Sequence, residues 1–182
     1  MLVRKRGNLF LASVFTVIFS LSFIAQVYAA TINLNAVKQV QTKWCWVASS
    51  ISILNTKGSN PTQCDFYRKA KGTDSCINNG GSVLEAQKGM KSYGTSSTYY
   101  DGSLTWTNLQ AQIDKKSPIY VSWGWKSGGN HPVVSYGYTT ANNTNFVYYM
   151  DPWDGSKTAM NYTSFKGGSS YDRTWRWGLK DF

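Results

Sequence analysis

The sequence contains one histidine and three cysteines in 182 residues. Cys45 stands between two tryptophans, and the lone imidazole is His131. A thiol becomes an effective nucleophile when an imidazole takes its proton, and the imidazole in turn needs an acceptor that orients its ring. Asp151 can supply that acceptor. These three residue types together predict a nucleophilic triad that carries out acyl transfer.

Acyl transfer also requires hydrogen-bond donors for the negative charge that develops on the carbonyl oxygen. Gln39 precedes Cys45 by six residues, and its side-chain amide could donate together with the backbone N–H of Cys45. Gln41 competes for this role, because it lies four residues before Cys45 and spacing alone does not separate the two glutamines.

The elements that must position these residues follow from the hydrophobic spacing. A helix expected over residues 44–55 would place Cys45 at its first turn, where unpaired N–H groups and the helix dipole favour a thiolate. After Pro118 the sequence favours strands, so that His131 would begin one strand and Asp151 would end the next across a short hairpin loop. Further helices are expected over 60–69, 82–91 and 105–115, and strands over 119–125, 132–138, 145–150 and 171–179.

Helices followed by an antiparallel sheet predict an α+β fold. The length is typical of one domain, and no repeat or linker divides the chain. Hydrophobic residues make up 42% of the sequence and aromatic residues 15%, which excludes a disordered protein. The formal net charge is +10, but the basic residues are scattered, so no nucleic-acid partner is expected. Most tryptophans, including Trp123 and Trp125, are expected to serve packing.

The N-terminal residues are typical of a secretory signal. A basic segment is followed by an apolar run over residues 9–25, and small residues before Ala30 form a cleavage site. We therefore expect a signal peptide over 1–29, a single domain over 30–182, secretion, and no stable membrane insertion after cleavage. The alternative is an uncleaved membrane anchor, for which the apolar run is short.

Export changes what the cysteines can do. In an oxidising compartment two of them can pair, and Cys64 and Cys76 are the natural pair because they lie close together in polar, loop-like sequence. Cys45 is then left as the one unpaired thiol.

Three segments occur in an order that resembles a known family: QVQTKWCWVAS over 39–49, GNHPVVSYGY over 129–138 and YMDPW over 149–153. Together they resemble the papain superfamily of cysteine peptidases, and most closely a compact bacterial branch that includes plant-pathogen effector proteases. Bacteriocin leader peptidases and staphopains are similar at lower specificity. The resemblance implies a papain-like fold with Cys45 as nucleophile, His131 as base and then acid, Asp151 as orienting acceptor and Gln39 as oxyanion donor.

The same resemblance assigns residues that shape the site. Trp153 would shield the hydrogen bond between Asp151 and His131 from water, and at least one of Trp44 and Trp46 would line the cleft. Asn130 stands where the branch usually has glycine, which changes the contact expected with the leaving-group side of a substrate.

These observations predict a secreted cysteine endopeptidase that forms a thioacyl intermediate on a protein or peptide substrate and uses no cofactor or metal. The alternatives are other acyl transfers on the same triad, namely deamidation, transglutamination or amide hydrolysis in cell wall, and a non-catalytic aromatic-rich binding module. The short segment between Ala30 and Gln39 has no room for an inhibitory domain, so control by export or by a host or inhibitor protein is expected.

Overall fold

The computed structural model describes residues 28–182. Most of the predicted signal peptide therefore lies outside the described residues. The elements in chain order are β1 (Tyr28–Thr31), α1 (Cys45–Thr56), α2 (Gln63–Lys71), α3 (Val83–Lys91), β2 (Thr98–Asp101), α4 (Trp106–Asp114), β3 (Ile119–Trp125), β4 (Asn130–Ala141), β5 (Thr144–Asp151), β6 (Ser156–Asn161), α5 (Tyr162–Lys166) and β7 (Arg173–Lys180).

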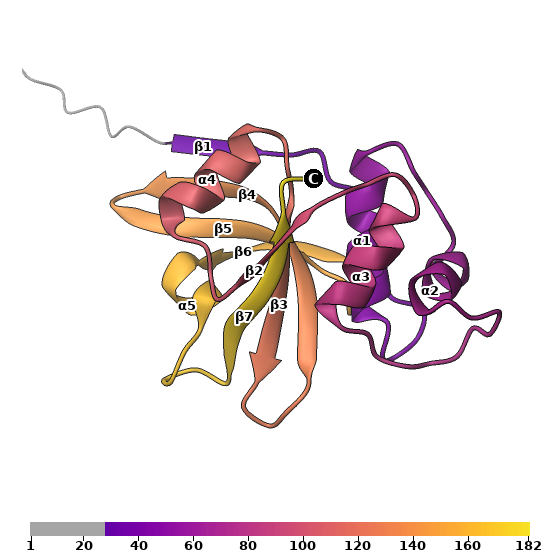
Figure 1. Ribbon diagram of the computed structural model, residues 1–182. Coiled ribbons are helices and arrows are strands. Elements are labelled where there is room, and N and C mark those ends of the chain that lie inside the picture. Colours follow the sequence, from indigo (N-terminus) through magenta and orange to yellow (C-terminus); the bar gives the residue numbers. More distant parts are fainter. Residues whose placement is uncertain (1–27) are drawn as a thin grey trace, which may run out of the picture.

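A seven-stranded antiparallel sheet forms the centre of the molecule, in the order β2-β7-β3-β4-β5-β6, with β1 paired to β4 beside this path. Helices α1, α2 and α3 lie together on one side of the sheet, and α4 and α5 lie on the other (Figure 1). The α+β class expected from the sequence is confirmed, with the helical half first and most of the sheet after it.

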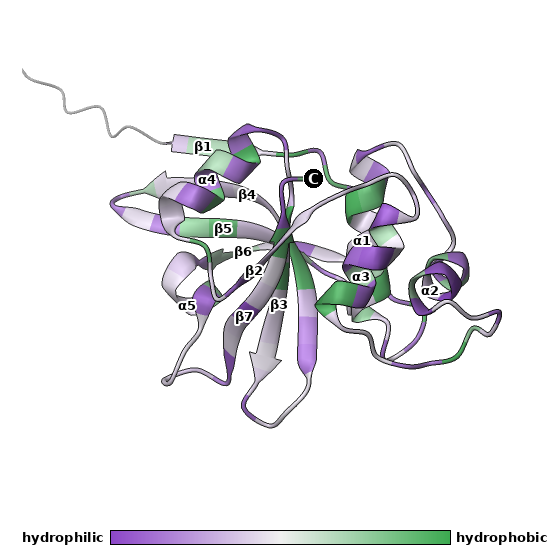
Figure 2. Cartoon of the chain, viewed as in Figure 1, coloured by the Kyte–Doolittle hydropathy of each residue, from purple (hydrophilic) through white to green (hydrophobic). Residues whose placement is uncertain are grey.

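The two sides of the sheet carry separate hydrophobic clusters, because successive side chains of a strand point to opposite faces. In β3, Val121 and Trp123 belong to the cluster with α4 and α5, whereas Tyr120 packs with α1, α2 and α3. Figure 2 shows the hydrophobic residues gathered along α1 and where the strands converge, while α2 is mainly hydrophilic.

Helix α1 is buried along most of its length, from Trp46 to Leu54. It carries three buried serines, and each hydroxyl has a backbone acceptor, as buried polar groups require. Ser50 donates to the carbonyl of Trp46 one turn earlier, and Ser52 donates to the carbonyl of Asn35. The buried helix therefore keeps its first residue, Cys45, in a fixed place relative to the sheet.

The hairpin between β4 and β5 has the short loop expected from the sequence. Asn142 and Asn143 form its tip with φ of 49° and 59°, the left-handed conformation that asparagine tolerates and that suits the twist of a two-residue hairpin. The register pairs Ala141 with Thr144 and Val134 with Met150. The start of β4 and the end of β5 are thereby brought to the same end of the sheet.

The predicted start of the second helix was wrong. Helix α2 begins at Gln63, because Thr62 is its cap and the side chain of Thr62 accepts from the backbone N–H of Asp65. Pro61 lies before the cap. The third helix expected from the sequence is present as α3, and a capping box begins it, with Ser82 and Glu85 each accepting from the other's backbone N–H.

Four short elements were not predicted: β1, β2, β6 and α5. Strand β6 is mostly exposed and β2 and β1 lie at edges, so their side chains carry no alternation of buried and exposed positions that a sequence pattern could reveal. Strand β1 includes Tyr28 and Ala29, so the predicted cleavage before Ala30 would fall within this strand. That cleavage stays a prediction.

The expected disulfide is present between Cys64 and Cys76, whose Cα atoms lie 5.5 Å apart. It joins α2 to the segment that leads from Cys76 to Gly81. Cys45 is the remaining cysteine and is half-buried. The pairing leaves a single thiol in the protein, as the cysteine count suggested.

Candidate active site

His131 and Asp151 meet at the end of the sheet where β4 begins and β5 ends. Nε2 of His131 lies 2.8 Å from Oδ1 of Asp151. The same carboxylate oxygen accepts from the backbone N–H of Trp153 at 2.9 Å. Because the second bond comes from the backbone two residues later, the turn after β5 itself holds the carboxylate toward the imidazole.

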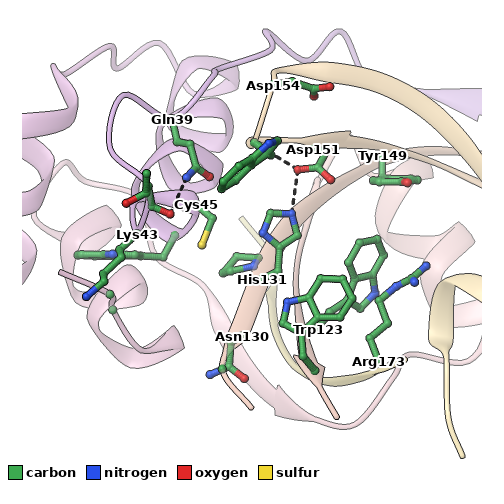
Figure 3. Close-up of a pocket in the computed structure, with 18 of the residues that line it drawn as sticks. Gln39, Lys43, Cys45, Trp123, Asn130, His131, Tyr149, Asp151, Asp154 and Arg173 are labelled. Atoms are coloured by element: carbon green, nitrogen blue, oxygen red, sulfur yellow. Dashed lines mark hydrogen bonds and ion pairs between the residues drawn. The ribbon is translucent and has the colours of Figure 1, made fainter. Parts of the chain in front are cut away.

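Cys45 reaches the site from the first residue of α1. Its neighbour Trp44 caps the helix without a side-chain hydrogen bond, and the first turn contains no acidic residue. The N–H groups at this end therefore have no side-chain acceptor, and they favour an anion nearby. Figure 3 shows the side chain of Cys45 beside the imidazole of His131, with Asp151 on the other side of the ring.

One buried hydrogen bond ties the two halves of the site together. Ser49, one turn after Cys45 on α1, donates to the carbonyl oxygen of Pro132 at 3.1 Å. Since Pro132 directly follows His131, this bond fixes where α1 sits along β4. The separation between the thiol and the imidazole is therefore set by the packing of the helix on the strand and not by a loop.

The charges around His131 stabilise its protonated form. Burial by itself lowers the pKa of the imidazole, but the hydrogen bond to Asp151, the interaction with Cys45 and the negative charges of both outweigh burial and raise the pKa from 6.5 to about 9. Burial raises the pKa of Asp151, and the hydrogen bond and charge of His131 more than offset this, so that the carboxyl pKa is lowered. At neutral pH the site therefore holds an imidazolium beside a carboxylate.

This raised pKa predicts the alkaline limit of activity. The imidazolium is present throughout neutral pH and is lost as the pH rises through about 9. With His131 as the general acid that the resemblance implies, kcat/KM should fall above that pH because no proton remains for the leaving amine. Asp151→Asn removes the carboxylate charge and should move the limb to lower pH. Measurement of kcat/KM across acidic and alkaline buffers checks this. A limb near the ordinary histidine value in the unaltered protein would contradict it.

Gln39 lies in the cleft and is only 7% exposed. Its backbone N–H donates to the carbonyl of Pro152 at 2.8 Å, which joins it to the turn after Asp151. Its side-chain Nε2 donates to the carbonyls of Gln41 and Thr42 at 2.9 and 3.0 Å. Both amide hydrogens are thus engaged, so a role as oxyanion donor requires that one of these bonds be exchanged for the substrate.

Gln41, the competitor for this role, is exposed and lines a different hollow, beside Trp44 and Pro61. The geometry therefore favours Gln39 among the two glutamines. The backbone N–H of Cys45 is the donor that needs no exchange, because the first residues of a helix have no acceptor within the helix.

These residues lie around a cleft of about 790 Å³ between the helical half and the sheet. Seven of the residues singled out in the sequence line it: Gln39, Cys45, Trp46, Asn130, His131, Asp151 and Trp153. Trp44 does not. It is buried in a stack on Tyr67 with ring centroids 5.2 Å apart.

Trp44 and Trp46 share a supporting role that the sequence did not reveal. The indole N–H of Trp44 donates to the carbonyl of Ile77 at 3.0 Å, and that of Trp46 donates to the carbonyl of Asn79 at 3.2 Å. The segment they hold continues into Gly81, which packs so closely on the Trp46 ring that a Cβ there would lie 2.4 Å from ring atoms. Together with the disulfide, the two indoles hold this wall of the cleft in place.

Trp153 is 61% exposed and lines the cleft. Its backbone N–H donates to the carboxylate of Asp151. The side chain of Asp151 remains 27% exposed. Shielding of the Asp151–His131 hydrogen bond by the indole stays a prediction.

Several residues that line the cleft were not predicted from the sequence, or were expected to serve only in packing. Trp123 and Trp125 lie with their ring centroids 6.3 and 6.2 Å from that of His131, and Tyr149 and Arg173 complete this wall. What brings Trp123 next to His131 is the register of β3 against β4, which pairs these two residues. That register is not readable from a single sequence.

Comparison with solved structures shows the class of fold. The chain resembles the peptidase domain of Streptococcus ComA, with a TM-score of 0.61, 21% identity, and coverage of 81% of this chain and 96% of that one. A double glycine motif protease from an AMS/PCAT transporter, solved with its leader peptide, gives a TM-score of 0.57, 15% identity, and coverage of 84% and 95%. Digestive procathepsin L 3 of Tenebrio molitor gives 0.53, 13% identity, and coverage of 91% and 72%. The fold is therefore that of the papain-like cysteine peptidases.

The family is shown by the sequence itself. Residues 31–177 match the model of the Peptidase_C39 like family. The chain belongs to that family, and it is a cysteine-type peptidase. A search of curated proteins found no match. The superfamily recognised from the three sequence segments is confirmed, whereas the narrower likeness to plant-pathogen effector proteases stays a prediction.

Within residues 28–182, no helix combines the length and the apolar character that crossing a membrane requires.

Proposed function

We propose that the protein is a secreted endopeptidase that uses Cys45, His131 and Asp151 as its catalytic residues. The observation that supports this most directly is the convergence of the lone thiol with the His131–Asp151 pair in one cleft. The raised pKa of His131 supports a resting state in which the cleft holds an imidazolium.

The proposed reaction proceeds in two halves. The Cys45 thiolate attacks the peptide carbonyl carbon, and the oxyanion is held by the backbone N–H of Cys45 and by Gln39 after its amide exchanges a partner. His131 gives its proton to the leaving nitrogen, the C–N bond breaks and a thioester remains. Neutral His131 then takes a proton from water, the hydroxide attacks the thioester, and the acid product leaves with the thiolate restored.

The substrate in this proposal is a peptide or protein segment in extended form, because the cleft is open between the two halves of the molecule. The structurally similar double glycine motif protease was solved with a leader peptide, which supports a peptide substrate for the fold. Secretion rests on the signal expected in residues 1–29. Deamidation, transglutamination and cell-wall amide hydrolysis remain the alternative acyl transfers, because the triad is chemically shared.

A peptide-library digestion tests this function. We expect each cleaved peptide to yield two fragments with one water added, as mass spectrometry would show, and no product in the Cys45→Ala protein. Products that keep the full chain but exchange an amide for an acid would indicate deamidation. Products joined to an added amine would indicate transfer to that amine, and either result in place of hydrolysis would overturn the endopeptidase proposal.

A further inference from the structure

Beyond His131, one end of the cleft forms a pocket that contains the cationic side chain of Arg173 and is lined by aromatic residues. We call it the arginine pocket, and its residues are Trp123, Trp125, Tyr149, Met160 and Arg173. Figure 3 shows Arg173 and Trp123 on the side of His131 away from Cys45. None of these residues takes part in the proposed reaction steps.

The guanidinium group of Arg173 lies over the aromatic walls. Its guanidinium carbon is 4.3 Å from the ring centroid of Trp123 and 5.9 Å from that of Trp125. The side chain is only 13% exposed. The rings hold the charge by cation–π attraction and fix the direction of the guanidinium group.

The hydrogen-bond capacity of Arg173 is only partly used. Nη1 donates to Asp172 at 2.9 Å, and that carboxylate is 69% exposed. Nη2 faces the sulfur of Met160, a weak acceptor, at 3.0 Å, and Nε is buried without a partner. A largely buried cation with one exposed partner is incompletely compensated, and a carboxylate from a ligand would supply a strong charge-assisted bond.

The other acids of the cleft do not fill this need. Asp151 is bound to His131. Asp154 accepts from the backbone N–H of Ser156 at 2.8 Å and forms no ion pair with Arg173. Arg173 therefore faces the cleft with its charge available to a bound molecule.

The proposed reaction indicates which part of a substrate would lie in the arginine pocket. The acyl fragment becomes attached to Cys45, whereas the leaving nitrogen must lie next to His131 to receive its proton. The leaving fragment thus extends toward the His131 side of the cleft, where the arginine pocket lies. This step rests on the proposed function.

We propose that Arg173 is a specificity residue that pairs with a carboxylate on the leaving fragment of the peptide. The carboxylate is either an acidic side chain close after the scissile bond or the C-terminal carboxylate of a short leaving fragment. Trp125, which is half-buried, provides apolar surface for the neighbouring carbon atoms, whereas the rings of Trp123 and Tyr149 are buried. The preferred substrate is therefore acidic on its leaving-group side.

Matched peptides test this proposal and separate the two sources of carboxylate. One pair differs only by Glu or Gln directly after the scissile bond, with both C-termini amidated. A second pair has a short leaving fragment ending in a free or an amidated C-terminus. We expect kcat/KM to favour the carboxylate of at least one pair by about tenfold or more, the effect of a hydrogen-bonded charge.

Three variants complete the test. Arg173→Gln should abolish the preference while cleavage of the uncharged peptide persists, and Asp172→Asn should strengthen it by removing the competing carboxylate. The matched control is Arg176→Gln on the same strand, whose exposed side chain lies over Trp177 outside the cleft; it should leave the preference unchanged.

Equal rates for both members of both pairs in the unaltered protein would overturn the proposal. So would a preference that survives in Arg173→Gln, or one that is lost equally in Arg176→Gln. If Arg173→Gln proves unfolded by circular dichroism, the Asp172→Asn protein decides, since an unchanged preference there contradicts the pairing. Absence of cleavage of every peptide would instead contradict the proposed endopeptidase function.

Discussion

Replacing Cys45 with alanine should reduce peptide hydrolysis by about 10⁴-fold or more, the size of loss seen when a catalytic nucleophile is removed. In the proposed mechanism the thiol forms the covalent bond to the substrate, and no second thiol can replace it because Cys64 and Cys76 are joined in a disulfide. The fold should survive, since Cys45 is half-buried at the first residue of α1 and alanine is a good helix former.

A thiol-directed peptidase inhibitor provides a second measurement on the same residue. Mass spectrometry should find one adduct per chain of the unaltered protein, located on Cys45, and none on Cys45→Ala. Ser50→Ala is the matched control, because Ser50 lies on the same helix and its hydroxyl bonds only within the helix, to the carbonyl of Trp46. Equal hydrolysis by the Cys45→Ala and unaltered proteins, or an adduct elsewhere, would refute the nucleophile.

Replacing His131 with alanine should have the second largest effect, a loss of about 10²–10⁴-fold, as expected for a general acid and base. The sequence contains no other histidine, so no imidazole can take over the proton transfers. The loss has two physical causes: the imidazolium no longer stabilises the thiolate, and the leaving nitrogen has no proton donor.

Two readouts distinguish this role from a structural one. The rate of Cys45 alkylation at neutral pH should fall in His131→Ala, since less thiolate is present, and added imidazole should restore part of the hydrolysis by entering the space of the lost ring. Asp151→Asn should lose less alkylation rate than His131→Ala, because it leaves the ring in place. Unchanged alkylation and no rescue in a folded His131→Ala protein would argue against the proposed proton transfer.

The sequence predicted the order of the main elements because each carries a strong local signal. The spacing of Val47, Ile51 and Leu54 marks α1, and the two asparagines at 142 and 143 mark the hairpin. It did not predict β6 or the start of α2. In β6 most side chains are exposed and show no period. At α2 the expected start was too early, because the capping bond of Thr62 depends on the local geometry.

Much of the candidate site was also visible in the sequence, for a chemical reason. With one histidine and one cysteine outside the expected disulfide pair, the residue types themselves limited the candidate triad to Cys45, His131 and an acid such as Asp151. Gln39 and Gln41, by contrast, have the same chemistry and nearly the same position. Only packing separated them, by burying Gln39 in the cleft and leaving Gln41 on the outer surface.

The sequence by itself determined the family, the candidate reacting groups and the elements that carry these groups, because residue identity and local periodicity are properties of the chain itself. The tertiary structure decided what surrounds them. Strand register placed Trp123 beside His131, the Ser49 hydroxyl fixed α1 on β4, and Trp44 was turned away from the cleft to hold its wall. The arginine pocket also arises only in three dimensions, since its residues come from four separate strands and meet through pairing between distant segments.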